Sequence, residues 1–263
     1  MNISIVQMDV VYKNKAENIA KLSNMLEAAD KVGELVLLPE LFSTGYIFNS
    51  PEEIHALCED YTNSLTITAL TQLASAHNTT IVAGVAEVED NQYFNSIAVV
   101  DKHGLQHKYR KISQTNIDRQ YFSRGDSLLT FKHHGLVFGV AVCFDLWFPE
   151  IIRPYAELGI DVLLHPANFG GPYSLHVSRS RAIENSMHVA TCNRIGKDIT
   201  KELSAEYCGS SQLCTPNGEY LVQFAQHEEL VTVDILGSHI ENKKVIGVDL
   251  LSEIRAITQQ LRV

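Results

Sequence analysis

The hydrophobic positions of this chain alternate between short continuous runs, which indicate buried strands, and runs at a spacing of three or four, which indicate helices. Strands are predicted over Ile3–Met8, Glu34–Leu38, Thr80–Ala86, Leu136–Cys143, Ile160–His165, Val189–Asn193, Gln212–Thr215, Glu219–Phe224 and Leu230–Ile235, with a hairpin of Tyr93–Val100 and Leu105–Arg110. Helices are predicted around Leu22 and Leu26, around Leu70 and Leu73, from Pro149 to near Gly159, and over Tyr173–Ser186. This alternation predicts an α/β domain with mixed sheets and outer helices.

The pattern also bears on how the chain is divided. No linker-like stretch interrupts it, so we predict a single domain over residues 1–263, in which 236–263 form a polar C-terminal tail. The tail contains a helix-like stretch near Leu250–Ile257, and we expect it to pack on a neighbouring element or on a partner subunit. One short echo occurs: ELVLLPE near Pro39 resembles IDVLLHP near Pro166. Two halves packed sheet to sheet would produce this echo, and so would chance.

Composition and charge exclude several classes of protein. The chain has 263 residues, of which 45% are hydrophobic and 20% are charged, so it can bury a large core and is not collagen-like or largely disordered. The formal net charge is −10, from 21 Lys and Arg against 31 Asp and Glu. Because phosphate binding needs a basic face, we expect neither a nucleic-acid partner nor binding to an anionic membrane.

Targeting signals and cysteines indicate the compartment. The N-terminal segment lacks the basic and apolar regions of a signal peptide, and no apolar run is long enough to span a bilayer. The five cysteines include no CxxC pair, which is typical of a chain whose thiols stay reduced. We therefore expect a cytoplasmic protein.

Three residues at or just after the ends of predicted strands could carry chemistry. Glu40 follows a buried strand, at the kind of position where α/β sheets bind ligands, although a solvated acid would also fit there. Lys111 ends the basic stretch Lys108–Lys111, which is either a solvated strand edge or the source of a fixed positive charge for an oxyanion. Cys143 ends a buried strand and precedes a helix, as either a small core residue or a thiol activated by backbone N–H groups.

Together these residues supply the three functions that acyl transfer requires. Glu40 is the candidate general base, Lys111 the oxyanion stabiliser and Cys143 the nucleophile. The 11 histidines give weaker signals, because none carries a local signature of a Cys–His pair. His165, before Pro166, is expected to be structural, and metal ligation by histidines is not expected.

The segments around these residues resemble the nitrilase, or carbon–nitrogen hydrolase, superfamily. The matching segments, in family order, are VLLPELFSTGY (Val36–Tyr46), KYRKI (Lys108–Ile112), VAVCFDLWFPE (Val140–Glu150), LLHPANF (Leu163–Phe169) and SRAIENSMHVATCNRIG (Ser180–Gly196), within a resemblance over Met1 to Ile257. The resemblance implies a four-layer αββα sandwich whose helices pair in a homodimer, or in a higher homo-oligomer. It also implies a Glu-Lys-Cys triad on Glu40, Lys111 and Cys143, an oxyanion hole completed by the backbone N–H of Phe144, and no metal or organic cofactor.

The resemblance further implies a mechanism and a substrate class. Glu40 takes the thiol proton, Cys143 attacks the carbonyl carbon of a small amide, ammonia leaves, and water cleaves the thioester. Members that cleave nitriles typically have Trp-Glu after the nucleophile. The sequence Phe144-Asp145 instead resembles the amidase and N-carbamoyl-amine hydrolase branches, so an aliphatic nitrilase is the alternative.

The chain also departs from the family pattern. Asp118 stands where many members have a second glutamate and is one methylene shorter, while Ser113-Gln114 replaces a frequent His-Leu. These differences leave a drifted, non-catalytic member as a second alternative.

We expect a substrate pocket next to the predicted triad. Its candidate lining residues are Tyr46, Asn168, Phe169 and Tyr173 at the mouth of the cleft, and Trp147, which would also fit as a packing residue. No arginine or lysine stands out as a partner for a substrate carboxylate, which favours neutral or cationic substrates.

Overall fold

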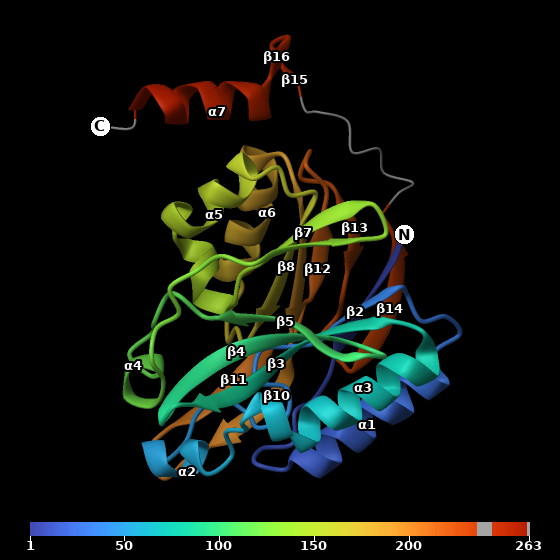
Figure 1. The fold of residues 1–263 in the computed structure, drawn as a ribbon, viewed down its shortest axis with the longest axis vertical. Helices are drawn as coiled ribbons and strands as arrows, with labels where there is room; N and C mark the ends of the chain where they lie inside the picture. The colour runs from blue at the N-terminus through green and yellow to red at the C-terminus, as the bar shows by residue number, and fades with distance from the viewer. Residues whose placement is uncertain (236–243, 262–263) are drawn as a thin grey trace.

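The computed structural model describes residues 1–235 and 244–261 of the chain. Two six-stranded β-sheets pack face to face, and helices cover the outer face of each sheet (Figure 1). The layers are therefore helix, sheet, sheet and helix, which confirms the four-layer αββα sandwich.

The first sheet has the strand order β14-β1-β2-β3-β4-β5. Its strands are β1 (Asn2–Gln7), β2 (Leu35–Leu37), β3 (Thr80–Glu89), β4 (Gln92–Asp101), β5 (Gly104–Arg110) and β14 (Glu229–Asp234). Strands β1, β2 and β3 are parallel, whereas β14 and β4 pair antiparallel with β1 and β3, and β5 pairs antiparallel with β4. The helices α1 (Lys15–Ala28) and α3 (Leu65–His77) cover its outer face (Figure 1).

The second sheet has the strand order β13-β12-β9-β8-β7-β6. Its strands are β6 (Thr130–His133), β7 (Leu136–Val140), β8 (Val162–Ala167), β9 (His188–Asn193), β12 (Gln212–Cys214) and β13 (Tyr220–Gln223). Strands β7, β8 and β9 are parallel, and the flanking strands are antiparallel. The helices α5 (Pro149–Glu157) and α6 (Tyr173–Asn185) cover its outer face (Figure 1).

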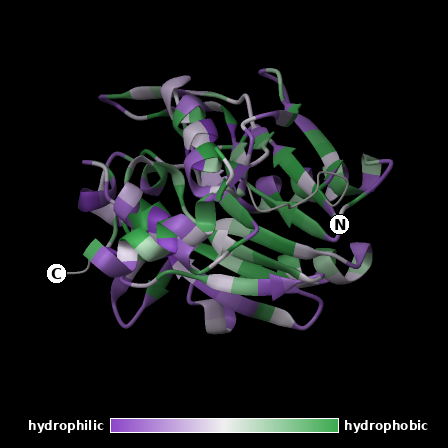
Figure 2. Cartoon of the chain, turned by 90° about the horizontal axis from the view of Figure 1, so that it is seen from above, coloured by the Kyte–Doolittle hydropathy of each residue, from purple (hydrophilic) through white to green (hydrophobic). Residues whose placement is uncertain are grey.

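The central strands are buried on both faces, which explains their continuous apolar runs. In β2, Leu35 and Leu37 pack into the core between the two sheets, whereas Val36 packs toward α1 and α3. In β8, Val162 belongs to the core between the sheets, whereas Leu163 packs with residues of α5 and α6. Figure 2 shows this distribution, with hydrophobic strands inside the molecule and polar segments outside.

The two sheets have the same sequence of strand directions. Read from β14 to β5 and from β6 to β13, each sheet has one antiparallel pairing, then two parallel pairings, then two antiparallel pairings. Strands β2 and β8 occupy the same place in this sequence. The echo between ELVLLPE and IDVLLHP therefore reflects two halves of one topology.

The prediction that the strand beginning at Leu136 extends to Cys143 was wrong. Strand β7 ends at Val140, and Cys143 begins the 3₁₀ helix η2 (Cys143–Trp147). The chain turns there because the Asp145 carboxylate accepts a hydrogen bond from the backbone N–H of Val142, at 2.9 Å. Further elements without a prediction are α2 (Pro51–His55), η1 (Tyr61–Asn63), α4 (Asp118–Tyr121), β10 (Ile195–Ile199) and β11 (Ser204–Cys208).

The C-terminal tail is more regular than predicted over its described part. It contains β15 (Lys244–Val245), β16 (Val248–Asp249) and α7 (Leu250–Leu261), so the helix extends beyond Leu250–Ile257. Helix α7 packs against α5 of the same chain, and Arg255 Nε donates to the carbonyl of Glu157 at 3.4 Å. Residues 236–243 and 262–263 of the predicted tail lie outside the described residues. Across 1–235 and 244–261, no helix has the length and apolarity that crossing a membrane requires.

Candidate active site

Strand direction brings the three candidate residues to one end of the two sheets. Glu40 follows β2, and Lys111 follows β5, which runs parallel to β2 through two antiparallel pairings. Cys143 follows β7 of the opposite sheet. All three are buried, with exposed fractions of 0% for Glu40, 3% for Lys111 and 7% for Cys143.

Two glycines let the backbone approach closely enough to build this site. Gly84 on β3 donates to the carbonyl of Pro39, and a Cβ atom there would lie 2.6 Å from the Cα of Glu40. Gly125 donates to the carbonyl of Lys111, and a Cβ atom there would lie 2.1 Å from the carbonyl oxygen of Arg110. Any larger residue at either position would displace the backbone that carries Glu40 or Lys111.

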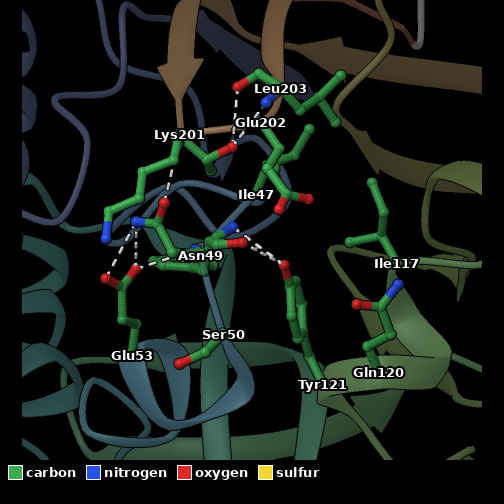
Figure 3. A pocket seen from close by; sticks show the side chains of 12 residues that line it. Ile47, Asn49, Ser50, Glu53, Ile117, Gln120, Tyr121, Lys201, Glu202 and Leu203 are labelled. Carbon is green, nitrogen blue, oxygen red and sulfur yellow. Dashed lines mark hydrogen bonds between the residues drawn. The ribbon is translucent and has the colours of Figure 1, made fainter.

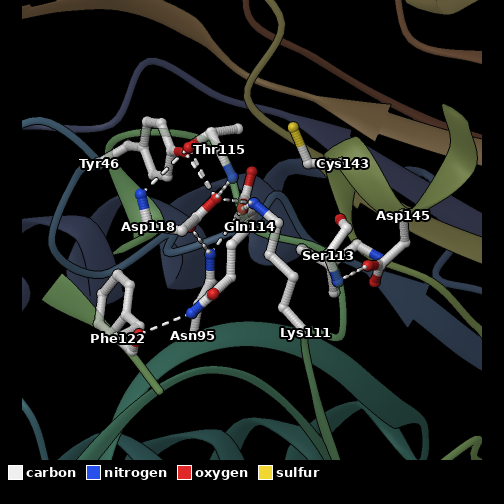
Figure 4. A network of polar contacts seen from close by, with 12 residues as sticks. Tyr46, Asn95, Lys111, Ser113, Gln114, Thr115, Asp118, Phe122, Cys143 and Asp145 are labelled. Atoms are coloured by element: carbon white, nitrogen blue, oxygen red, sulfur yellow. Dashed lines mark hydrogen bonds and ion pairs between the residues drawn. The ribbon is translucent and has the colours of Figure 1, made fainter. Parts of the chain in front are cut away.

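Lys111 joins two carboxylates. Its Nζ donates to Glu40 Oε1 at 2.9 Å. It also donates to Asp118 Oδ2 at 2.9 Å, and Figure 4 shows Lys111 beside Asp118. Asn95, on β4, also donates to Glu40 Oε1, at 2.6 Å. The other residues of the basic stretch, Lys108 and Arg110, pair with Glu87 instead. Of the three cations between 108 and 111, Lys111 is therefore the one that faces the site.

Asp118 is held more completely than Glu40. Its Oδ2 also accepts from the backbone N–H of Thr115 at 2.9 Å, from Thr115 Oγ1 at 2.8 Å and from the Tyr46 hydroxyl at 3.1 Å. The shorter aspartate side chain thus reaches the lysine directly. Glu40 Oε2, by contrast, is buried with no hydrogen-bond partner in the described part of the chain.

These surroundings move the two carboxyl pKa values apart. Burial raises the pKa of Glu40, and the charge of Asp118 raises it further, while Lys111 and Asn95 oppose the shift without cancelling it. Burial also acts to raise the pKa of Asp118, but the charge of Lys111 and the hydrogen bonds outweigh it, so this pKa is lowered. Asp118 therefore remains ionised, and Glu40 is the more basic carboxylate.

At neutral pH the Lys111 amine is charged, whereas the Cys143 thiol is neutral. Burial acts to lower the pKa of Lys111, but the charges of Asp118 and Glu40 raise it well above its usual value, so the amine stays protonated. Burial and the charge of Glu40 raise the pKa of the Cys143 thiol well above its usual value, so the resting thiol is neutral. A neutral thiol needs a neighbouring base before it can attack a carbonyl group.

The backbone of Cys143 is fixed by its neighbours. Its φ of +47° lies in the left-handed region, which is unusual for a residue with a side chain. The His165 Nε2 donates to the carbonyl of Cys143 at 3.0 Å, and Nδ1 accepts from the Thr191 hydroxyl at 3.1 Å. Burial lowers the pKa of His165 to about 4, so the ring is neutral. These contacts agree with the structural role predicted for His165.

The five candidate pocket residues fall into two groups. Tyr46, Asn168 and Phe169 are buried, and the backbone N–H of Asn168 points to the Cys143 thiol. Both polar atoms of the Asn168 side chain are buried without a hydrogen-bond partner among the described residues. Trp147 and Tyr173 instead lie at the surface, with exposed fractions of 43% and 74%. The structure thus buries the first group and exposes the second, and the assignment of all five to the substrate pocket stays a prediction.

A separate cavity of about 520 Å³ lies beside the site. Figure 3 shows it between α2, α4 and the connection from β10 to β11, where Ile47, Ile117 and Leu203 line it. Its walls continue from the segments that carry Tyr46 and Asp118, but no residue of the triad is among its lining residues. The buried network is therefore separate from this cavity, which is a neighbouring surface feature.

The sequence reasoning missed two residues that contact the network. Asn95 is a polar side chain within the apolar run of β4, and it bonds Glu40. Thr115 fixes Asp118 through both its backbone and its hydroxyl. A polar residue inside a buried strand was the available signal for Asn95, whereas nothing local marked Thr115. Within residues 1–235 and 244–261, no group of three or more His, Cys, Asp and Glu is arranged to hold a metal ion.

Comparison with known proteins agrees with this architecture. A nitrilase of Pyrococcus abyssi is 34% identical over 250 residues, which cover 93% of each chain. A 2-oxoglutaramate amidase of Bacillus subtilis is 31% identical, over 89% of this chain and 90% of the relative. The structure of an amidase of Nesterenkonia, from the nitrilase superfamily, matches with a TM-score of 0.80 over 100% of this chain and 97% of that chain, at 20% identity.

The match extends to the family as a whole. The family model for carbon–nitrogen hydrolases matches residues 2–243, a range that contains the strand ends carrying Glu40, Lys111 and Cys143. The chain therefore belongs to the carbon–nitrogen hydrolase family, within the nitrilase superfamily.

Proposed function

We propose that this chain is a thiol amidohydrolase that cleaves a small linear amide through a thioester on Cys143. The observation that carries the proposal is that the two carboxyl groups beside Lys111 differ in pKa and in the number of hydrogen bonds they accept. Asp118 is saturated with donors and ionised, whereas Glu40 has a raised pKa and an unpartnered Oε2. Such a pair assigns Glu40 as the base for the neutral thiol and Asp118 as the anchor of the lysine.

The proposed reaction has two stages. In the first, Glu40 accepts the thiol proton, the sulfur of Cys143 bonds to the amide carbon, and the tetrahedral oxyanion collapses as Glu40 returns the proton to the leaving ammonia. In the second, Glu40 takes a proton from water, the hydroxide attacks the thioester carbon, and the proton returns to the sulfur as the acid leaves. The sum is amide plus water giving carboxylic acid plus ammonia.

Two positive groups are available to stabilise the oxyanion. Lys111 is held protonated by its two carboxylates, so it presents a permanent charge. Phe144 is the second residue of η2, and the first backbone N–H groups of a helix have no acceptor within that helix. Lys111 and the N–H of Phe144 are therefore the proposed oxyanion hole.

Burial and charge support a small substrate without a free carboxylate. The three proposed reacting residues are each at least nine-tenths buried, which favours a small acyl group. The two buried Lys and Arg side chains of the described residues already have carboxylate partners: Lys111 has Glu40 and Asp118, and Arg194 has Asp198 at 2.9 Å. A neutral amide, or the carbamoyl group of an N-carbamoyl amine, fits these surroundings.

Nitrile hydrolysis is the second candidate function. It is favoured by the relative from Pyrococcus abyssi, which is named a nitrilase and is 34% identical. The same thiol would attack the nitrile carbon, and two waters would then be consumed to release ammonia and the acid. The two functions are distinguished by whether a nitrile or the corresponding amide is turned over faster.

The deciding experiment is ammonia release from a panel of short aliphatic amides, ω-amides of dicarboxylates, N-carbamoyl amines and small nitriles. We expect release from an amide or carbamoyl amine, and loss of that release in Cys143→Ala. Cys58→Ala is the matched control, because Cys58 is a half-buried thiol on another part of the chain. Release that persists in Cys143→Ala would contradict the proposal, and faster turnover of a nitrile than of its amide would select the second candidate.

The same panel can also show that the chain is a non-catalytic member of the family, whose site has lost its activity. Such a member would release no ammonia from any class of substrate, and its folded form would not react with iodoacetamide at Cys143. The direct contact between Asp118 and Lys111 argues for the catalytic alternative, because the shorter carboxylate still completes the network.

A further inference from the structure

A buried carboxylate near the site has no part in the proposed reaction. Asp145 is completely buried, yet it forms no ion pair within the described residues. Its oxygens accept three hydrogen bonds instead, all from neutral groups: the Tyr109 hydroxyl, the backbone N–H of Ser113 and the backbone N–H of Val142. A buried acid is costly, so its retention there calls for a specific reason.

The three donors come from the two segments that carry the reacting groups. Tyr109 and Ser113 lie two residues before and two residues after Lys111, on the first sheet and its continuation. Val142 lies directly before Cys143, at the end of the second sheet. The distances are 2.7 Å from the Tyr109 hydroxyl, 2.7 Å from Ser113 N and 2.9 Å from Val142 N.

The carboxylate therefore connects the two sheets at the point where the site is assembled. Oδ2 accepts from Tyr109 and from Val142 together, and Oδ1 accepts from Ser113. Figure 4 shows Asp145 and Ser113 on the side of Lys111 where Cys143 lies. Lys111 donates hydrogen bonds to both Glu40 and Asp118. No hydrogen bond between side chains of the described residues joins Cys143 to these three residues. Asp145 supplies the missing connection through the backbone.

We propose that Asp145 is a positioning residue that fixes the turn of Cys143 against the segment of Lys111, and thereby sets the alignment of the thiol with the charged network. This inference rests on the proposed function for its kinetic consequences, although the connection itself is a property of the fold. A displacement of a reacting group by about 1 Å can cost about 100-fold in rate.

Two substitutions test this role at different strengths. Tyr109→Phe removes one hydroxyl and leaves both backbone donors, so we expect kcat to fall by about threefold. Asp145→Asn keeps the size of the side chain but replaces one carboxylate oxygen with an NH₂ group, which then faces one of the N–H or O–H groups that donate to Asp145. We therefore expect kcat to fall by about 10-fold to 100-fold. KM should change by less than about twofold in both, because Asp145 does not touch the substrate.

Two readouts separate positioning from a loss of folded protein. The first is kcat per folded molecule, with the folded fraction taken from urea unfolding followed by circular dichroism. The second is the second-order rate constant for alkylation of Cys143 by iodoacetamide, with Cys143→Ala as the blank. We expect this rate constant to change at least about threefold in Asp145→Asn, because the thiol has moved relative to Glu40 and Lys111.

The control is Tyr61→Phe. Tyr61 is also buried and donates to a backbone carbonyl, that of Val85, at 2.8 Å, but it does not contact Asp145. It should leave both readouts unchanged.

Wild-type kcat per folded molecule and wild-type alkylation in Asp145→Asn would overturn the proposal. If Asp145→Asn does not fold, Tyr109→Phe decides, and unchanged values in both readouts would overturn it as well. If the wild type releases no ammonia from any substrate, the proposed function fails, whereas the alkylation rate still tests the position of the thiol.

Discussion

The two halves of this molecule share one topology but supply different chemistry. The first half carries the charged groups, Glu40 and Lys111, whose ion pair is buried. The second half carries Cys143, whose thiol is neutral because burial and the charge of Glu40 raise its pKa. Neither half contains all three residues of the proposed triad. The site therefore exists only where the sheets meet.

Equivalent positions make the difference explicit. The run Leu38-Pro39-Glu40 after β2 corresponds to His165-Pro166-Ala167 at the end of β8. The carboxylate of the first half is replaced by the methyl group of Ala167, and Leu38 is replaced by a histidine that holds the backbone of Cys143. A shared topology places residues at the same edge of each sheet, but the residue types at that edge decide the chemistry.

The largest effect is expected from removing the base of the first half. Glu40→Gln keeps the shape of the side chain but cannot accept the thiol proton, so kcat should fall by about 1,000-fold. The measurement is ammonia release from the best substrate of the panel, with folding checked by circular dichroism.

The matched control for that variant is Glu59→Gln. Glu59 is also a buried carboxylate of the first half, bonded to Lys15, Ser64 and Thr66, away from the network. It should lower stability while kcat stays within about twofold. A Glu40→Gln variant with kcat within tenfold of the wild type would show that Glu40 of the first half is not the base for the thiol of the second half.

A smaller effect is expected from Asp118, which sharpens the distinction between the two carboxylates. The negative charge of Asp118 disfavours the ionised form of Glu40, so Asp118→Asn should lower the pKa of Glu40. The acidic limb of the kcat/KM profile should then move to lower pH, and kcat/KM near neutral pH should fall by about 100-fold because Lys111 loses an anchor. Profiles measured from about pH 4 to about pH 9 test this.

Asp118→Glu is the conservative comparison, because it keeps the charge. Its acidic limb should stay near that of the wild type. An acidic limb that stays in place or moves to higher pH in Asp118→Asn would contradict the assignment of Glu40 as the titrating base.

The smallest effect concerns stability and belongs to the second half. The unfolded chain protonates His165 with a pKa near 6.5, whereas burial lowers the folded pKa to about 4. The unfolded state therefore binds more protons between these values, and the free energy of unfolding falls as the pH drops through this window. At pH 5 the loss from His165 should be about 2 kcal/mol relative to neutral pH.

Urea unfolding near pH 7 and near pH 5 measures this contribution. In His165→Gln the decrease between the two pH values should be smaller by about 2 kcal/mol, because glutamine does not titrate. His103→Gln, at an exposed turn, should show the same decrease as the wild type. Equal decreases in the wild type and in His165→Gln would mean that the ring is not held neutral beside Cys143.

The sequence was sufficient for much of the fold because its patterns are local. The central strands are buried on both faces, so their apolar runs marked most of them without reference to any partner. The residues at the ends of these runs, Glu40 and Cys143, were visible because a carboxylate or a thiol is conspicuous next to an apolar run. The strand that carries Cys143 was predicted too long, since its end depends on a hydrogen bond to Asp145.

Contacts between distant segments decided the rest. Asn95 reaches Glu40 across 55 positions of sequence, and Asp145 reaches Ser113 across 32, so no local pattern could have paired them. The exposure of Trp147 in η2 and of Tyr173 at the start of α6 was likewise decided by the tertiary structure, and not by their aromatic character.

The chain by itself thus determined which residues could act as base, cation and nucleophile, because those properties belong to side-chain types. Only the tertiary structure decided which of two carboxylates is basic, since Glu40 and Asp118 share Lys111 and differ in their remaining donors. A pKa depends on burial and on charges a few ångströms away, and those neighbours are brought together by the packing of two sheets.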